Sequence, residues 1–563
     1  MTAKPHALAF TLLLAGFAVA ADASVTLELR SVGGQGFALA QDDATTSVQM
    51  VAPGVLHVHY TPMGHTTPSS LVIDPQYTPA TTFKPEVSHK GNAVTLRSKQ
   101  MVVDWNPKTI TLTVSDAQGT VLLRQTDLMA LSEERIVLEH AAGDALYGIG
   151  GFEANKPVTG LLRSGKQIAQ AGKQGHAGAP FVWSTAGYGV LVDCDGADFG
   201  LANGRITVDN FKRPDADYYI LVGTPKELFA ELARLSGPAP LFPKWAMGFT
   251  NSQWGIDQKE LLDIVKTYRA KHIPIDNFTL DFDWKAWGQG DYGEFRWNPE
   301  KFPDGPNGKL AKRLADEGVH LTGIMKPRLL LGTAEGDYAT AHDLWIPGEQ
   351  AYPEYFSHKM AKDVDFDKPA ARRWFGELAM KYGFDDGIAG WWNDEADVYG
   401  KDGKPTSNTQ FLNMQRALYD AQRTVSDQRV WSINRTFWLG AQRYAYGMWS
   451  GDIDTGFASM AAQRARMLSA VEVGEAKWGM DGGGFNGHPS DENYARWIEF
   501  GAFTPIFRVH GTFNEKRQPW RYGPVAEAAA TAAIRLRYSL IPYIYAYQHS
   551  DYASGVGLVR PLT

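Results

Sequence analysis

Two patterns of apolar and polar positions divide the chain near Pro240. Before this point, short segments alternate between apolar and polar residues, most clearly at 54–60, 93–97 and 109–114. Alternation with a period of two is typical of strands that bury one face, and turn-forming residues separate these segments. The pattern therefore predicts an antiparallel β-sandwich over residues 24–240.

Beyond Pro240 the pattern becomes that of amphipathic helices separated by short apolar strands. Helices are expected at 257–271, 309–317 and 369–382. Strands are expected at 275–281, 320–325, 387–393 and 430–434, with further strand segments near Met448, Trp478 and Phe503. About eight strands alternating with helices over roughly 300 residues are typical of a (β/α)8 barrel. The predicted fold class is therefore α/β, with a (β/α)8 TIM barrel at 241–555 preceded by the antiparallel sandwich.

Composition narrows the classes of function. The 563 residues include 55 basic and 62 acidic side chains, for a net charge of −7, and no long basic run. This balance argues against nucleic acid as a partner. Aromatic residues make up 12% of the chain, which suits an enzyme or binding protein for sugars. Cys194 is the single cysteine, so an intrachain disulfide and a cysteine-based zinc cluster are excluded.

The two ends of the chain carry signals of their own. Residues 1–23 resemble a secretory signal peptide, with an apolar run from Ala7 to Val19 and small residues at the cleavage position. An uncleaved N-terminal anchor is the alternative. No later run reaches the roughly 18 apolar residues of a spanning helix. We therefore expect a periplasmic or secreted protein that leaves the membrane after signal cleavage. Residues 556–563 are expected to begin a C-terminal β domain that is cut short.

Acidic residues follow several of the predicted barrel strands, often beside tryptophan or glycine. Active sites of such barrels form where the strands end. Paired carboxylates perform glycoside cleavage, while flat aromatic rings pack on sugar rings. A lone aspartate in a loop is more often a turn residue, but several at successive strand ends indicate a site. The candidate residues are Asp281, Asp283, Asp394, Asp452 and Asp481, joined by Arg435 and by the pair Arg508 and His510. Strand alternation places Asp281 and Asp283 on one face.

Other chemistries lack their motifs. The sequence has no G-x-S-x-G elbow, no HExxH, no phosphate-binding loop and no dinucleotide fingerprint in a βαβ context. His57 and His59 project to the same side of one predicted strand and are candidate metal ligands. With no third ligand apparent, we interpret them as a structural pair.

Short motifs from Leu146 to the C-terminus resemble glycoside hydrolase family 31, which contains retaining α-glucosidases, α-xylosidases and their relatives. They occur in the family's order and spacing. The motifs are Leu146-Tyr-Gly-Ile-Gly, Pro180-Phe-Val-Trp-Ser, Pro243-Lys-Trp-Ala-Met-Gly, Trp449-Ser-Gly-Asp, Asp481-Gly-Gly-Gly-Phe and Phe503-Thr-Pro-Ile-Phe-Arg-Val-His-Gly.

The resemblance implies roles for the candidate residues. Asp394 matches the nucleophile and Asp452 the acid/base of a double displacement with net retention. The remaining candidates fall at substrate-binding positions, with Trp392 and Trp449 as pocket walls. These positions are Asp281 or Asp283, Trp284, Lys326, Trp392, Arg435, Trp449, Asp481, Arg508 and His510. The resemblance implies no metal and no organic cofactor.

Two departures from the family pattern bear on specificity. Asp397 stands where the family's nucleophile motif usually has glutamate. Lys326 replaces an acidic residue that contacts the sugar's far hydroxyls in many α-glucosidases, which puts a preference for glucose in question; a surface-facing Lys326 is the alternative.

The expected function is an exo-acting retaining α-glycoside hydrolase with α-glucosides as the default substrate. The alternatives are an α-galactosidase, α-N-acetylgalactosaminidase or α-xylosidase of the same family, a catalytically impaired sugar-binding relative, and a lyase that shares the glycosyl-enzyme. The expected partner is an oligosaccharide or glycoside, and the oligomeric state is open.

Overall fold

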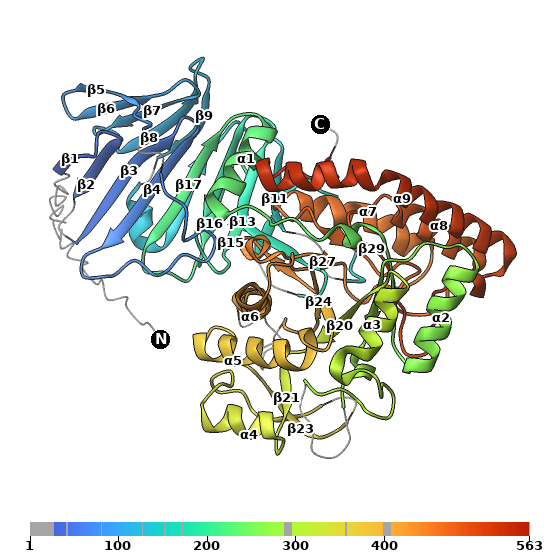
Figure 1. The fold of residues 1–563 in the computed structure, drawn as a ribbon. Helices are drawn as coiled ribbons and strands as arrows, with labels where there is room; N and C mark the ends of the chain where they lie inside the picture. The colour runs from blue at the N-terminus through green and yellow to red at the C-terminus, as the bar shows by residue number, and fades with distance from the viewer. Residues whose placement is uncertain are drawn as a thin grey trace, which may run out of the picture.

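The computed structural model describes residues 28–561, except 41–42, 80–81, 127, 151–153, 159, 170–172, 287–294, 355–356 and 398–406. The expected signal peptide, residues 1–23, lies outside the described residues. Figure 1 shows two parts: a layered β domain formed by the N-terminal third, and a larger part in which helices surround short strands.

The β domain consists of two antiparallel sheets. The first has the order β1 (Glu28–Val32), β2 (Gly36–Ala40), β3 (Ala44–Ala52), β4 (Val55–Pro62), β17 (Ala216–Val222), β14 (Tyr188–Val192), β13 (Ala177–Ser184) and β11 (Leu146–Gly150). The second has the order β12 (Gln167–Ala169), β15 (Asp198–Gly200), β16 (Arg205–Asp209), β10 (Arg135–Glu139), β9 (Val121–Gln125), β8 (Thr111–Asp116), β7 (Met101–Asn106), β6 (Ala93–Arg97) and β5 (Glu86–Lys90). Their inner faces share one apolar core. The predicted sandwich is confirmed, because the alternating positions bury one face of each strand.

The larger part is a barrel of parallel strands. Their order is β18 (Phe249–Gln253), β19 (Asn277–Leu280), β20 (His320–Met325), β24 (Ile388–Asn393), β25 (Ser432–Asn434), β27 (Met448–Trp449), β28 (Trp478–Gly479) and β29 (Phe507–Val509), with β29 pairing back to β18. The seam between β28 and β29 is joined by the amides of Ile506 and Gly482, which donate to the carbonyls of Trp478 and Arg508 at 3.0 Å each. The predicted (β/α)8 barrel is confirmed.

Helices cover the outside of the barrel (Figure 1). They are α2 (Gln258–Ala270), α3 (Lys309–Asp316), α5 (Pro369–Ala379), α6 (Thr409–Val425), α7 (Phe457–Val471), α8 (Asp491–Gly501) and α9 (Gly523–Ser554). Helix α4 (Ala334–Ala341) lies beyond α5, next to a small sheet outside the barrel. A small sheet of β21 (Arg328–Leu330), β23 (Met360–Asp363) and β22 (Tyr352–Pro353) follows β20. The helix predicted at 257–271 is α2, which begins after the N-cap Asp257 because this side chain accepts a hydrogen bond from the Glu260 amide.

The sandwich and the barrel pack against each other. Helix α1 (Pro225–Ser236) lies between them, and its buried leucines share a core with residues of both parts. Strand β26 (Phe437–Trp438), which follows β25, pairs in parallel with β13 of the sandwich. This contact brings a sandwich segment next to the ends of the barrel strands.

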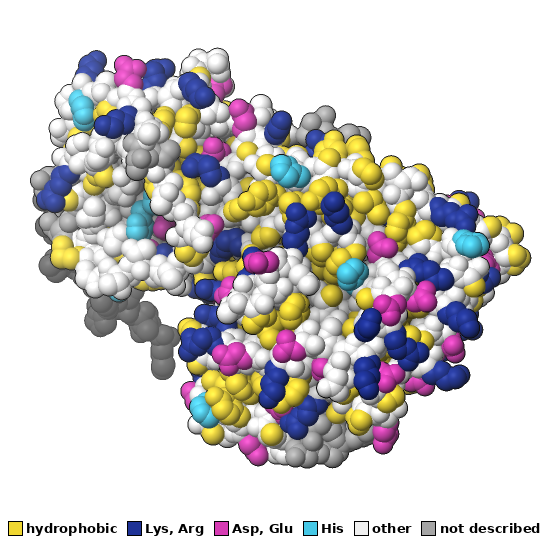
Figure 2. All heavy atoms as spheres, viewed as in Figure 1, with side chains coloured by type: hydrophobic (Ala, Val, Ile, Leu, Met, Phe, Trp, Pro, Cys, Tyr) yellow, Lys and Arg dark blue, Asp and Glu magenta, His cyan; other side chains and the backbone are white. Residues whose placement is uncertain are grey.

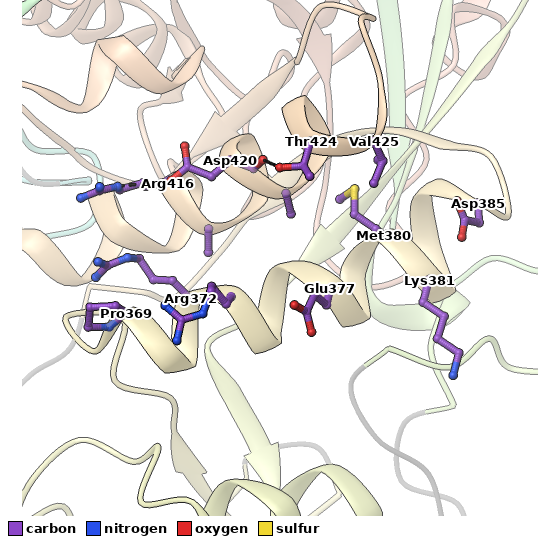
Figure 3. A pocket seen from close by; sticks show the side chains of 13 residues that line it. Pro369, Arg372, Glu377, Met380, Lys381, Asp385, Arg416, Asp420, Thr424 and Val425 are labelled. Carbon is purple, nitrogen blue, oxygen red and sulfur yellow. Dashed lines mark hydrogen bonds and ion pairs between the residues drawn. The ribbon is translucent and has the colours of Figure 1, made fainter. Parts of the chain in front are cut away.

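One surface cavity lies away from the ends of the barrel strands. On the face in view, basic and acidic side chains are interspersed over the barrel (Figure 2). A cavity of about 590 Å³ lies between α5 and α6, where Arg372, Arg416 and Asp420 line it (Figure 3). It belongs to the helical layer and includes none of the candidate residues from the strand ends.

Candidate active site

The candidate residues gather at one end of the barrel because each lies at or just after the carboxyl end of its strand. Asp281 follows β19, Lys326 follows β20, Asp394 follows β24, Arg435 follows β25, Asp452 follows β27, Asp481 follows β28, and Arg508 and His510 lie in and after β29. In a parallel barrel these ends share one face. Segments separated by more than two hundred residues thus meet in one site.

Asp394 lies between two cations. The Arg435 Nη1 atom is 3.3 Å from Asp394 Oδ1, and the Lys326 Nζ atom is 3.8 Å from Asp394 Oδ2. The amide of Glu395 also donates to Oδ1, at 2.9 Å. The Asp394 side chain is 12% exposed, so it can be reached by a ligand while its orientation is held by these contacts. A carboxyl group held beside two cations and a backbone amide has the fixed orientation that a nucleophile needs.

Arg435 contacts Asp394 and Asp397 and is close enough to Asp452 to feel its charge. Its Nε atom is 2.9 Å from Asp397 Oδ1, and its Nη2 donates to Asp397 Oδ2 at 3.1 Å. Burial alone would lower the pKa of Arg435, but the charges of Asp397, Asp394 and Asp452 raise it above its ordinary value. Asp397 therefore fixes the guanidinium, which in turn contacts Asp394.

Asp452 has the electrostatics of an acid/base group. Burial raises its pKa to about 7; Arg435 opposes this rise, and the charges of Asp394 and Asp481 add to it. Its backbone carbonyl accepts hydrogen bonds from Asn155 Nδ2 at 2.6 Å and Asn486 Nδ2 at 3.0 Å. Asp452 is thus held in place and can carry a proton near neutral pH, unlike an ordinary aspartate.

The base of the site is polar and aromatic. Arg508 forms a buried ion pair with Asp481, and its guanidinium carbon lies 4.6 Å from the ring centre of Trp392 and 5.3 Å from that of Trp449. The His510 ring stands edge to face on Trp392, with centroids 4.9 Å apart. Arg508, Trp392, Trp449 and His510 therefore form one packed layer.

Asp281 and His510 face each other beside this layer, with His510 Nε2 3.4 Å from Asp281 Oδ2. Burial raises the pKa of Asp281 to about 7. Burial also lowers the pKa of His510 to about 3, so the imidazole is neutral at physiological pH. A neutral imidazole can both donate and accept a hydrogen bond, which suits contact with a sugar hydroxyl.

Several buried polar atoms of this layer have no hydrogen-bond partner among the described residues. They are Arg508 Nε and Nη1, Asp481 Oδ2, Trp392 Nε1 and Trp449 Nε1. Each such group costs roughly 1–3 kcal/mol when it stays unpaired, so native structures rarely collect them without reason. Donors and acceptors gathered beside aromatic rings match the hydroxyls and C–H faces of a sugar.

Comparison with known proteins identifies the family. Residues 239–547 match the model of the glycosyl hydrolases family 31 TIM-barrel domain. The chain belongs to glycoside hydrolase family 31.

Two relatives show how far the likeness extends. The 1,6-alpha-glucosyltransferase of Sporosarcina globispora is 38% identical over 554 residues, which cover 92% of this chain and 43% of that enzyme. An alpha-xylosidase of Saccharolobus solfataricus is 26% identical over 506 residues, covering 83% of this chain and 67% of the relative. The family 31 chain thus spans less than half the length of the first of these relatives.

Solved structures share the fold. A GH31 alpha-xylosidase from a soil metagenome, complexed with xylose, has a TM-score of 0.85 at 21% identity, covering 95% of this chain and 87% of that one. The GH31 dextranase of Flavobacterium johnsoniae, complexed with glucose, has a TM-score of 0.81 at 20% identity, covering 95% and 70%. Such low identities establish a common architecture only.

Lys326 is buried, so the alternative that its side chain faces the surface is wrong. Its side chain is 2% exposed, and its Nζ lies 3.1 Å from Glu395 Oε1 and 5.3 Å from the ring centre of Phe282. The ammonium therefore contacts carboxylates of the site, including Asp394. The positive charge of Lys326 is thus paired with carboxylates of the chain itself. This pairing weakens the argument that Lys326 disfavours glucose.

Asp283 and Trp284 do not join the gathered residues. The expectation that Asp281 and Asp283 share one face is wrong, because the chain leaves the strand and forms a 3-10 turn at Phe282–Trp284. The Asp283 carboxylate accepts hydrogen bonds from Lys301 Nζ at 2.6 Å and from the Gly255 amide at 2.7 Å. Trp284 is 1% exposed and packs edge to face on Trp297 in the barrel core.

Sequence reasoning missed a contribution from the sandwich. Gln174, from the segment between β12 and β13, forms a hydrogen bond with the Asp452 side chain. Gly451 has a φ of +81°, and a Cβ there would lie 2.6 Å from Gln174 and 2.9 Å from Ala154. The loop that carries Asp452 therefore packs directly on sandwich residues. Nothing in the pattern of 154–176 signals this contact, since it depends on the two domains packing together.

Glu395 was also missed, although it positions Asp394. Its backbone has a φ of +56°, a left-handed conformation that costs a non-glycine residue roughly 1–2 kcal/mol. Its carboxylate forms ion pairs with Lys326 and Arg328, which hold this conformation. The strained turn directs the Glu395 amide at Asp394 Oδ1. The cluster of charges at Lys326, Arg328 and Glu395 is the sequence signal that could have revealed it.

Glu395→Gln is expected to lower kcat by about 10–100-fold with a smaller change in KM, because a small misplacement of a nucleophile slows the chemical step most. Steady-state kinetics on an aryl α-glycoside measure the split. Glu231→Gln, which removes the acidic partner of Arg234 on α1, is the matched control and should behave as wild type. A wild-type kcat for Glu395→Gln would show that its ion pairs do not orient Asp394.

Proposed function

We propose that this chain is an exo-acting retaining α-glycosidase that releases terminal α-linked sugars, with α-glucosides as the default substrate. The observation that carries the proposal is the pair of carboxyl groups that follow β24 and β27, the two strands on either side of β25. Asp394 lies between Lys326 and Arg435, and Asp452 has a pKa raised to about 7. Retaining glycoside cleavage needs two carboxyl groups, one that attacks and one that carries a proton.

The proposed reaction is a double displacement. The Asp394 carboxylate attacks the anomeric carbon while the bond from this carbon to the leaving oxygen breaks, and Asp452 gives its proton to that oxygen. Asp452, now ionised, takes a proton from water, and the resulting hydroxide displaces Asp394 from the anomeric carbon. Two inversions restore the original configuration. Arg508, Asp481 and His510 are proposed to bind hydroxyls of the sugar.

Transfer to a second sugar is the other candidate, favoured by the 38% identity to the 1,6-alpha-glucosyltransferase of S. globispora. Both reactions form the same glycosyl-enzyme and differ only in whether water or a sugar hydroxyl attacks it. A lyase would instead lose a proton from that intermediate. A sugar-binding protein without activity is disfavoured, because Asp394 and Asp452 are both present and in electrostatic contact.

We further propose export to the periplasm or the medium, which rests on residues 1–23 of the sequence. Across the part of the chain that the structure describes, no helix is both long and apolar enough to cross a membrane. A fusion of residues 1–23 to a reporter that folds only after export tests the proposal, and a reporter retained in the cytoplasm would contradict it.

A panel of aryl α-glycosides tests the activity. The panel contains the aryl α-glycosides of glucose, xylose, galactose and N-acetylgalactosamine. NMR identifies the anomeric form of the released sugar. Release from the glucoside with retained configuration is expected. Chromatography with maltose or isomaltose added separates transfer from hydrolysis, and a near-ultraviolet absorbing unsaturated product would indicate a lyase. Inverted product, or no release by the folded protein, would contradict the proposal.

The pH profile should show which carboxyl group donates the proton. A general acid must be protonated, so kcat/KM should fall as pH rises through about 7, the raised pKa of Asp452. Asp281 has a similar pKa, so the leaving group separates the two. A 2,4-dinitrophenyl glycoside needs no acid and should lose this basic limb, whereas a methyl glycoside should keep it. A limb of equal size on both substrates would exclude Asp452 as its origin.

A further inference from the structure

A second cluster of ionisable side chains lies in the sandwich, on β4 and β17, which run side by side (Figure 1). His57 and His59 of β4 lie on one face, while Leu56 and Val58 point into the sandwich core. Asp217 of β17 lies directly opposite His59 in the strand register. Asp217 is thus the third potential ligand that was not apparent in the sequence. It lies 158 residues or more from the two histidines along the chain, and the neighbouring strand brings it beside them.

The potential ligand atoms converge. His57 Nε2 is 2.7 Å from Asp217 Oδ1, and one ligand atom from each of His57, His59 and Asp217 lies within 4.8 Å of the others. Around a tetrahedral zinc ion, with bonds near 2.1 Å, ligand atoms are separated by about 3.4 Å. The observed separations bracket that value, so small side-chain rotations suffice.

The surroundings hold the three side chains in place. The His57 ring stacks on Tyr219, with centroids 4.3 Å apart and planes at 4°. His59 Nε2 is 3.0 Å from Asp215 Oδ2, and Thr61 Oγ1 is 3.4 Å from the same nitrogen. The side chains of His57, His59 and Asp217 are 19%, 17% and 11% exposed, which leaves an approach for an ion and for water.

The local charge suits a cation. Arg213 is the nearby guanidinium, and it is paired with Asp193 at 2.8 Å and with Asp215 at 2.9 Å. This guanidinium is thus already paired with two carboxylates.

We propose that His57, His59 and Asp217 form a binding site for one divalent transition-metal ion, with Zn²⁺ as the ion that fits best. Two imidazoles and one carboxylate are a ligand set that zinc accepts, with water in the fourth position. Asp215, which contacts His59 Nε2, would then act as an outer partner and leave Nδ1 of this ring for the metal. The ion would link β4 to β17, so its role is to stabilise the sandwich; the barrel site is built from other strands.

Zn²⁺ titration of the EDTA-treated full chain by calorimetry tests the site, with Co²⁺ replacing Zn²⁺ for visible spectroscopy. One ion per chain at micromolar affinity and the intense spectrum of tetrahedral Co²⁺ are expected. A saturating ion that binds only the folded chain should also raise the Tm. Glycosidase activity should change little on EDTA treatment, which separates this site from the proposed active site.

Variants show whether these residues bind the ion. His57→Ala with His59→Ala, and separately the milder Asp217→Asn, should weaken Zn²⁺ binding by about 100-fold or more and abolish the Tm shift. His89→Ala, on exposed β5, is the matched control and should bind as wild type. Circular dichroism checks that each variant folds. If the double variant does not fold, Asp217→Asn still tests the site, because asparagine preserves the shape of the side chain. Absence of Zn²⁺ binding by the wild type at 100 μM, or equal binding by the folded variants, would overturn the proposal and leave the cluster as hydrogen-bonded pairs.

Discussion

Replacing Asp394 with alanine is expected to reduce turnover by about four orders of magnitude or more while the protein folds normally. The fold should persist because the contacts around Asp394 are redundant: Arg435 keeps its ion pair with Asp397, and Lys326 keeps its ion pair with Glu395. The measurement is kcat/KM on the best aryl glycoside of the panel, with circular dichroism and Tm on the same preparation.

Azide gives this experiment a second, stereochemical readout. In Asp394→Ala a small anion can occupy the space of the missing carboxylate and attack the anomeric carbon once, so any rescued product should be the inverted glycosyl azide. Asp263→Ala, an exposed aspartate on α2, is the control and should keep wild-type activity. Activity near wild type for Asp394→Ala, or a rescued product with retained configuration, would remove Asp394 from the role of nucleophile.

The barrel could be predicted because its signals are local. Strand 320–325 and the helix after Asp257 follow from periodicity and capping within a few residues, and these lie where the pattern placed them. The strand ends then define where side chains meet, which is why Asp394, Arg435 and Asp452 could be grouped from the sequence. Their mutual contacts follow from the barrel geometry rather than from any one motif.

The parts that could not be predicted depend on tertiary packing or on unusual backbone. Asp283 was misplaced because the alternation of a strand was extended past Leu280, where the chain already turns. Gln174 and Asn155 reach the Asp452 loop only because the sandwich packs on the barrel. The left-handed turn at Glu395 is held by Lys326 and Arg328 from another strand end, so no local preference of glutamate could reveal it.

This packing also explains why the sandwich matters to the proposed chemistry. Burial raises the pKa of Asp452 to about 7, and the hydrogen bond with Gln174, a residue next to Gly451, opposes this rise. The sandwich therefore supplies a hydrogen-bond partner for the proposed acid as well as packing against the barrel.

Replacing Asp452 with alanine should produce a loss that depends on the leaving group. Cleavage of a methyl or sugar aglycone should fall by about 10²–10⁴-fold, the usual contribution of a positioned acid, because the leaving oxygen receives no proton. A 2,4-dinitrophenyl glycoside leaves as a stable anion, so formation of the glycosyl-enzyme should be nearly unchanged and its breakdown should become slow. A burst of dinitrophenol followed by a low steady rate is the expected trace.

Azide distinguishes this variant from Asp394→Ala. In Asp452→Ala azide attacks the glycosyl-enzyme already formed on Asp394, needs no general base, and should restore the steady rate with the glycosyl azide in retained configuration. Asp263→Ala, the exposed aspartate on α2, is again the control and should keep wild-type activity. Equal losses on all leaving groups together with no rescue by azide would mean that Asp452 does not move the proton, because both effects require a residue that acts first as an acid and then as a base.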